Sequence, residues 1–191
     1  MAPLLRLSGL IDRLNGWVGR VVAWLILVNV LISAGNAVMR YGFNMSSNAW
    51  LEIQWYLFSA VFLLCAGYTL LRNEHIRIDI LAGRTAPRTQ AWIDVVGSAL
   101  FLLPMSLLMI WLAWPLAVES YARQEMSSNA GGLIRWPVKI LLPLGFLLLS
   151  LQGFSELIKR IAALRGLLPL PGSGPQPGHA AGLPPADRGR A

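Results

Sequence analysis

The sequence predicts an all-α membrane protein that crosses the bilayer with four transmembrane helices. Three observations carry this prediction: 55% of the 191 residues are hydrophobic, only 13% are charged, and the mean hydropathy is +0.57. An ordinary soluble domain contains about a quarter charged residues, and a water-soluble globule of this size could not hide so much apolar surface. The same composition excludes an intrinsically disordered chain.

Four apolar runs are each long enough to cross the hydrocarbon core, which takes about 20 consecutive apolar residues in a helix. Each run begins with a tryptophan and the third also ends with one, as is typical of side chains that anchor a span at the lipid headgroups. The expected spans are residues 17–38, 50–71, 92–114 and 136–158. With their connections they make up a four-helix transmembrane domain, residues 17–165.

The two flanking segments differ from the membrane domain and from each other. In residues 1–16 leucine and isoleucine recur at helical spacing with arginine, aspartate and asparagine between them, which predicts a short amphipathic helix on the cytoplasmic membrane surface. Residues 166–191 are rich in proline and glycine and have no periodicity, which predicts a disordered tail. The first apolar run exceeds the 7–15 residues of a typical signal-peptide core, so it is interpreted as a span rather than a cleaved signal.

The basic residues predict the orientation of the chain. Twelve of the 16 lysines and arginines lie before or at the start of the first run, between the second and third runs, or after the fourth. Basic residues concentrate on the cytoplasmic side of membrane proteins, so both termini are expected to be cytoplasmic. The net charge of +7 is therefore a topology signal, and no basic stripe on a polar scaffold indicates a nucleic-acid partner.

Motifs for catalysis or cofactor binding are absent from the sequence. It contains no GxxxxGK[ST] loop, no HExxH and no GxSxG, and its single cysteine, Cys65, excludes a CxxC pair. The two histidines, His75 and His179, lie outside the apolar runs, where they are unable to hold a haem between helices. The sequence thus predicts neither an enzyme nor a bound cofactor or metal.

Polar residues inside the runs have two interpretations: a path for a solute or ion, or contacts within a bundle and with a partner. The second is favoured, because these residues lie near the ends of the runs and no carboxylate lies at mid-membrane. Glu52 lies about two residues inside the non-cytoplasmic boundary. It is expected to stay hydrated, to pair with a basic residue of a partner, or to cap a loop.

Several short motifs, in order along residues 10–165, resemble the small membrane subunit of TRAP transporters, the DctQ-like proteins. Residues 73–79, Asn-Glu-His-Ile-Arg-Ile-Asp, are similar to the family's HIxVD signature, and Trp50, Glu52 and Trp55 are similar to the start of its second helix. The last loop and helix carry further matches, at Glu125, Ser127, Asn129, Gly131, Gly132, Trp136, Pro137, Lys139, Pro143, Gly145 and Phe146.

The resemblance implies a small integral-membrane subunit of a three-part secondary transporter in the bacterial inner membrane. In such a system a periplasmic solute-binding receptor delivers an organic acid or similar small solute to a large multi-span permease subunit. The small subunit packs against the large one within the lipid bilayer, and uptake is expected to be coupled to sodium. The resemblance also implies a list of residues for subunit contact or structural support: Glu52, Trp55, His75, Arg77, Asp79, Asn129, Gly131, Gly132, Trp136, Pro137, Lys139 and Pro143.

Each group of these residues has a plainer interpretation as well. His75, Arg77 and Asp79 either order the turn after the second span or contact the large subunit, or they belong to a hydrated basic loop. Gly131 and Gly132 either face a docking receptor or supply a turn before the fourth span. Two other functions remain open for the whole chain: a membrane anchor of a redox complex, and a small transporter that forms by self-oligomerisation.

Overall fold

The computed structural model describes residues 1–45, 47–72 and 86–169, and nearly all of them are helical. Four helices are long and apolar enough to cross a membrane: Ala2–Phe43, Asn48–Arg72, Pro87–Ala122 and Trp136–Leu164. Each contains one of the expected spans, so the prediction of four apolar helices is confirmed. His75, Arg77, Asp79 and most of the expected tail lie outside the described residues.

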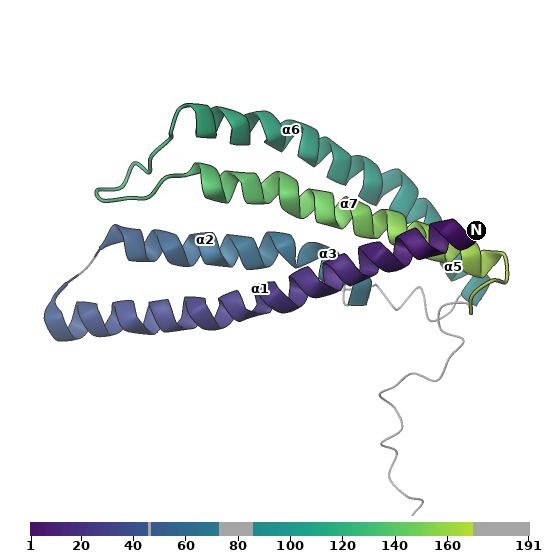
Figure 1. Ribbon diagram of the computed structural model, residues 1–191, viewed down its shortest axis with the longest axis horizontal. Coiled ribbons are helices and arrows are strands. Elements are labelled where there is room, and N and C mark those ends of the chain that lie inside the picture. Colours follow the sequence, from purple (N-terminus) through teal and green to yellow (C-terminus); the bar gives the residue numbers. More distant parts are fainter. Residues whose placement is uncertain (46, 73–85, 170–191) are drawn as a thin grey trace, which may run out of the picture.

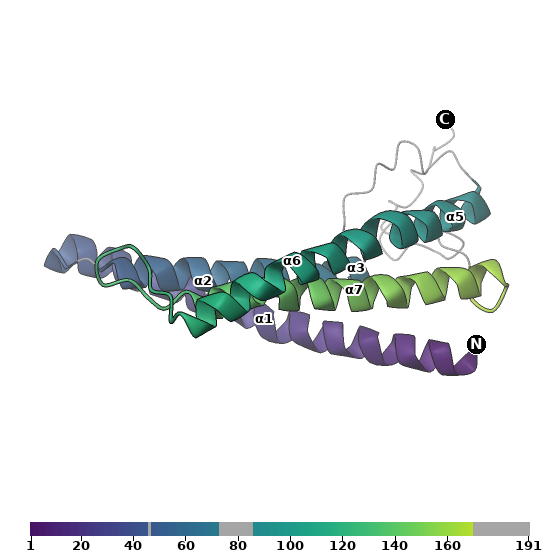
Figure 2. The same cartoon turned by 90° about the horizontal axis from the view of Figure 1, so that it is seen from above.

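The first and fourth of these helices are regular, whereas the second and third contain local irregularities. The first is α1 (Ala2–Phe43) and the fourth is α7 (Trp136–Leu164). The second consists of α2 (Asn48–Leu64) and α3 (Ala66–Arg72), and the third of α5 (Pro87–Gly97), the π-helix η1 (Ser98–Leu102) and α6 (Leu103–Ala122). In Figures 1 and 2, α7 lies between α5–α6 on one side and α1 on the other.

The π-helix η1 occurs directly before a proline. Pro104, in the first turn of α6, has no backbone N–H to donate, and its ring crowds the preceding turn of a regular α-helix. In η1 the Leu103 N–H donates to the Ser98 carbonyl, five residues back, which is the pattern of a π turn. The third span therefore accommodates the proline without ending.

Two glycines allow the second span to lie close to its neighbours. A Cβ atom on Gly145 of α7 would lie 2.7 Å from the Leu63 carbonyl oxygen and 2.8 Å from the Leu63 Cβ. A Cβ atom on Gly67 of α3 would lie 2.3 Å from Oδ1 of Asn15 and 3.0 Å from the Leu148 carbonyl oxygen. At these two points α7 meets α2 and α1 meets α3 at distances that only a glycine permits.

Polar side chains join α1 to α7. Asn15 donates to Gln152 Oε1 at 3.0 Å, and the hydroxyl groups of Ser8 and Ser155 share a hydrogen bond of 2.7 Å. Asp12 accepts from Gln152 Nε2 at 2.9 Å and from Ser155 Oγ at 2.8 Å. Four of these five residues are buried, so the hydrogen bonds occupy groups that would otherwise be unsatisfied.

The N-terminal segment differs from the separate short helix expected for residues 1–16. It is the first part of α1, which continues without a break to Phe43. Its buried face is formed by Ser8, Ile11 and Asn15, while Leu7 and Leu14 are exposed. The small and polar residues, which look like a water-facing side in the sequence, are the ones that pack on α7.

The close approach of α7 and α2 leads to a matched pair of substitutions. We expect Gly145→Ala to lower the free energy of unfolding by about 1–3 kcal/mol, since the new methyl group meets Leu63 backbone atoms that have no room to move. Gly35→Ala, on an exposed face of α1 with nothing within 4 Å, should be neutral or stabilising by up to about 1 kcal/mol. Unfolding of both variants in mixed detergent micelles measures the difference, and equal effects would contradict the packing described.

Candidate functional site

The carboxylate of Glu52, on α2 at the end of the bundle where the loop joins α6 to α7, is almost completely buried, with 4% of the residue exposed. It accepts three hydrogen bonds from the loop between α6 and α7. The Leu133 N–H donates to one oxygen at 2.7 Å, and Asn129 Nδ2 donates to the other at 2.8 Å. Ser127 Oγ donates to that second oxygen as well. Of the three roles considered for Glu52, the structure shows the capping of a loop.

The loop is itself a small closed hairpin. Met126 and Ile134 form an isolated antiparallel bridge, and the Ser127 N–H donates to the Leu133 carbonyl at 2.9 Å. The bridge holds Ser127 beside Leu133, so their donors reach Glu52 together. A single carboxylate thereby fixes both sides of the hairpin.

Two glycines form the tip of this hairpin. Gly131 has a φ of 70°, in the left-handed region that residues with a side chain rarely adopt. A Cβ atom on Gly132 would lie 2.4 Å from the Ser127 Cβ and 3.0 Å from the Asn129 carbonyl oxygen. Both positions therefore require glycine for the turn itself, which supports the plainer of their two interpretations.

Two other side chains of the second span reach the same loop. Asn48 Nδ2 donates to the Ala130 carbonyl at 3.1 Å, and the Tyr56 hydroxyl donates to the Ile134 carbonyl at 3.2 Å. Asn48, Glu52 and Tyr56 are four residues apart, so they lie along one face of α2. This face holds the hairpin along its whole length.

An ion pair fastens the beginning of the loop to α7. Lys139 Nζ pairs with Glu125 Oε2, and about a third of each side chain is exposed. The hydrogen bond and charge of Lys139 hold the pKa of Glu125 below its ordinary value of 4.5. Because the folded-state pKa is the lower one, the pair stabilises the protein fully above pH 4.5 and loses this contribution as the pH falls through the folded-state pKa.

The first residues of α7 are fixed by aromatic packing and by proline. The rings of Trp136 and Tyr121 lie edge to face, with centroids 5.3 Å apart. Pro137 occupies the first turn of α7, where its missing N–H costs no helical hydrogen bond. Pro143 lies further along the helix and is buried.

A small pocket of about 270 Å³ opens beside this site, between α2 and the start of α7. Its lining includes Glu52, Trp55, Tyr56, Arg135 and Lys139. Trp55 is 66% exposed, as suits an aromatic side chain at the membrane interface.

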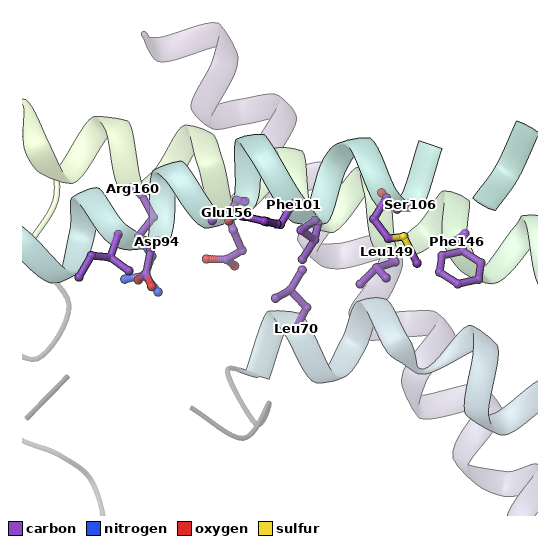
Figure 3. A pocket seen from close by; sticks show the side chains of 13 residues that line it. Leu70, Asp94, Phe101, Ser106, Phe146, Leu149, Glu156 and Arg160 are labelled. Atoms are coloured by element: carbon purple, nitrogen blue, oxygen red, sulfur yellow. The ribbon is translucent and has the colours of Figure 1, made fainter. Parts of the chain in front are cut away.

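A larger groove of about 680 Å³ lies at the other end of the bundle (Figure 3). Leu70 of α3, Phe101 of η1, and Phe146 and Leu149 of α7 supply much of its apolar lining. At one end Arg160 Nε lies 3.4 Å from Asp94 Oδ2, so the two charges neutralise each other. The groove is mainly apolar, and two other polar residues of its lining are bound to neighbours outside it: Ser106 to Ser150, and Glu156 to Lys159.

The expected site residues thus fall into distinct groups. Glu52 and Asn129 are hydrogen-bonded to each other, and Gly131 and Gly132 shape the same loop. Trp55, Trp136, Pro137 and Lys139 lie beside that loop or begin α7, and Pro143 lies two turns further along α7. The sequence patterns did not identify Ser127 and Leu133 as partners of Glu52. Ser127 lies among polar loop residues that could have indicated it, whereas the Leu133 donor is a backbone N–H, which no side-chain pattern reveals.

This arrangement defines a multi-pass helical membrane protein in which a buried carboxylate fixes the loop between α6 and α7. The chain belongs to the family described as "Tripartite ATP-independent periplasmic transporters, DctQ component", whose model matches residues 29–163. It is therefore a transporter component and not an enzyme, and the resemblance found in the sequence is confirmed.

One curated relative supports the same assignment. The chain is 27% identical over 103 residues to a protein of Haemophilus influenzae described as "Putative TRAP transporter small permease protein". The match covers 53% of this chain and 63% of the relative, which is less than two thirds of its length. No solved structure matches the chain.

Replacement of the buried carboxylate should release the loop. We expect Glu52→Ala to lower the free energy of unfolding by about 2–4 kcal/mol, because three donors lose a charged acceptor. It should also expose the segment 126–134 to added protease in detergent micelles. Glu119→Ala is the matched control, since Glu119 forms only an exposed ion pair with Arg123. A loop equally resistant in both variants would disprove the capping role.

Proposed function

We propose that this chain is the small membrane subunit of a tripartite transporter of the bacterial inner membrane. It packs against a large multi-span permease subunit and supports secondary, sodium-coupled uptake of an organic acid or a similar small solute. A periplasmic receptor delivers the solute to the assembly. The observation that carries the proposal is the family match over residues 29–163.

The internal contacts of the bundle support an accessory role over a transport path within this chain. Every carboxylate of the described residues is engaged in an ion pair or a hydrogen bond. A solute path needs polar groups that face a cavity and exchange partners with the solute. In the described spans these groups instead hold helices and a loop together.

The surface of the bundle supports a second protein as its neighbour. Large apolar side chains of all four spans are exposed, among them Trp24, Phe62, Phe101 and Trp111. Lipid covers some of this surface, and a large subunit in the same membrane would cover the rest. The 123–135 loop, fixed by Glu52, offers a preformed surface for a receptor, and charge-complementary docking there would weaken as salt rises.

The proposed topology places both termini in the cytoplasm and the 123–135 loop in the periplasm. In a Cys65→Ser background, we expect Ser128→Cys to react with a membrane-impermeant maleimide in intact cells. Arg165→Cys, just after α7, should react only after the inner membrane is permeabilised. The reverse pattern would overturn the orientation while leaving the helices as described.

Purification of the tagged full-length chain from its own host in mild detergent tests the proposed function directly. We expect a large multi-span permease to co-purify at one copy per small subunit, as identified by mass spectrometry. A flavin or iron–sulfur subunit in its place would indicate a redox anchor. Recovery of the chain alone as an oligomer that passes solute in vesicles would indicate a self-contained transporter, and either result would overturn the proposal.

A further inference from the structure

One face of α1 carries large apolar side chains at alternating intervals of three and four residues. The series begins Leu7, Leu10, Leu14, Trp17, Val21, Trp24, and the same spacing continues to Leu31. These six side chains are between 43% and 70% exposed. Intervals of this kind are the heptad pattern by which one helix packs along another, and we call this face the α1 seam.

The seam starts well before the part of α1 that matches the bilayer. Residues 21–39 contain no charged side chain and rise about 28 Å, close to the hydrocarbon thickness of about 30 Å. Leu7, Leu10 and Leu14 precede this segment by up to two heptads. Lipid tails that cover Val21 and Trp24 therefore do not reach the beginning of the seam.

The opposite face of the same segment is fixed to α7. Ser8 and Asn15 are buried and hydrogen-bonded to Ser155 and Gln152, and α1 is an unbroken helix through this region. The segment is thus unable to turn away and lie flat on the membrane surface. A helix running alongside α1 is the one surface that covers the whole seam, because it follows the axis of α1 both inside and outside the hydrocarbon.

Arginines indicate the charge of that neighbouring helix. Arg6, Arg13 and Arg20 recur every seven residues, all exposed, along one edge of the seam. Residues beside a heptad seam form ion pairs with the facing helix, so these positions select carboxylates.

A second copy of this chain does not provide them. If two copies of α1 paired in parallel, Arg6 and Arg13 would face the residues five positions later in the other copy, Ile11 and Val18, which are apolar. If they paired antiparallel, the arginines of one copy would face the arginines of the other and repel them.

We propose that the α1 seam is the docking face for one long helix of the large permease subunit, with apolar heptad positions and acidic residues facing Arg6 and Arg13. This inference rests on the proposed function, which supplies the partner. It goes further by naming the face, the direction of contact along α1 and the chemistry of the facing helix.

Photo-crosslinking in native membranes tests the seam. With benzoylphenylalanine in place of Leu10 or Leu14, we expect covalent adducts with the large subunit, at least about fivefold more than with the same probe at Gly9. Gly9 is exposed, has nothing within 4 Å of an added Cβ, and lies about 100° around the helix from Leu10. Adducts with phospholipid alone would show that the seam faces the membrane, and adducts with a second copy would show self-association; both overturn the proposal.

Neutralisation of the arginines tests the charge. When the tagged Arg6→Gln, Arg13→Gln double variant is purified in mild detergent at low salt, we expect about threefold less large subunit to co-purify than with the unaltered chain. The double variant Arg88→Gln, Arg165→Gln removes two exposed positive charges at the same end of the bundle and should recover as much as the unaltered chain. Equal recovery from both double variants would refute the acidic partner helix.

The unaltered chain separates this inference from the proposed function. If it co-purifies with the large subunit while the seam probes label only lipid or a second copy, the seam assignment alone fails. If no large subunit co-purifies with the unaltered chain, the proposed function fails first.

Discussion

The packing of small and polar side chains along α7 is the constraint on which the rest of the bundle depends. In a bilayer, apolar surfaces gain little from leaving lipid for another helix, so association rests on close packing and interhelical hydrogen bonds. Every other described helix contacts α7. Gly145 lets α2 approach, Ser150 donates to Ser106 of α6 at 2.8 Å, and Gln152 and Ser155 bind α1.

The two ends of the bundle are closed by different means, and together they make it stiff. At the end that holds the N-terminus, Lys159 pairs with Asp12 and Glu156, and Arg160 pairs with Asp94, so charges join α1, α5 and α7. At the opposite end a single buried carboxylate, that of Glu52, organises the loop that connects α6 to α7. Such a body has few internal degrees of freedom, because each end is tied together by charged side chains.

The four spans could be predicted from the sequence because hydropathy over about 20 residues is a property of each run alone. The contacts between spans could not. Ser8 and Asn15 have the composition of a solvent-facing side, and only the position of α7 shows that they are buried. For Glu52 the sequence left three roles open, since the choice depends on whether a loop 75 residues later folds back over it. Asn129 was found through its place in a motif, whereas the backbone N–H of Leu133 is the same in every residue type except proline.

The π-helix in the third span sets the rotation of α5 relative to α6 about the axis of this span. A π turn arises when one residue is inserted into an α-helix, and each residue corresponds to about 100° of rotation. Removal of one residue from Ser98–Leu102 would restore a regular helix but turn α5 by that angle relative to α6. Asp94 would then leave Arg160, and the buried Ala91 would rotate away from its contacts. The extra residue thus sets the phase between two halves of one span, so that both present their packing faces to α7.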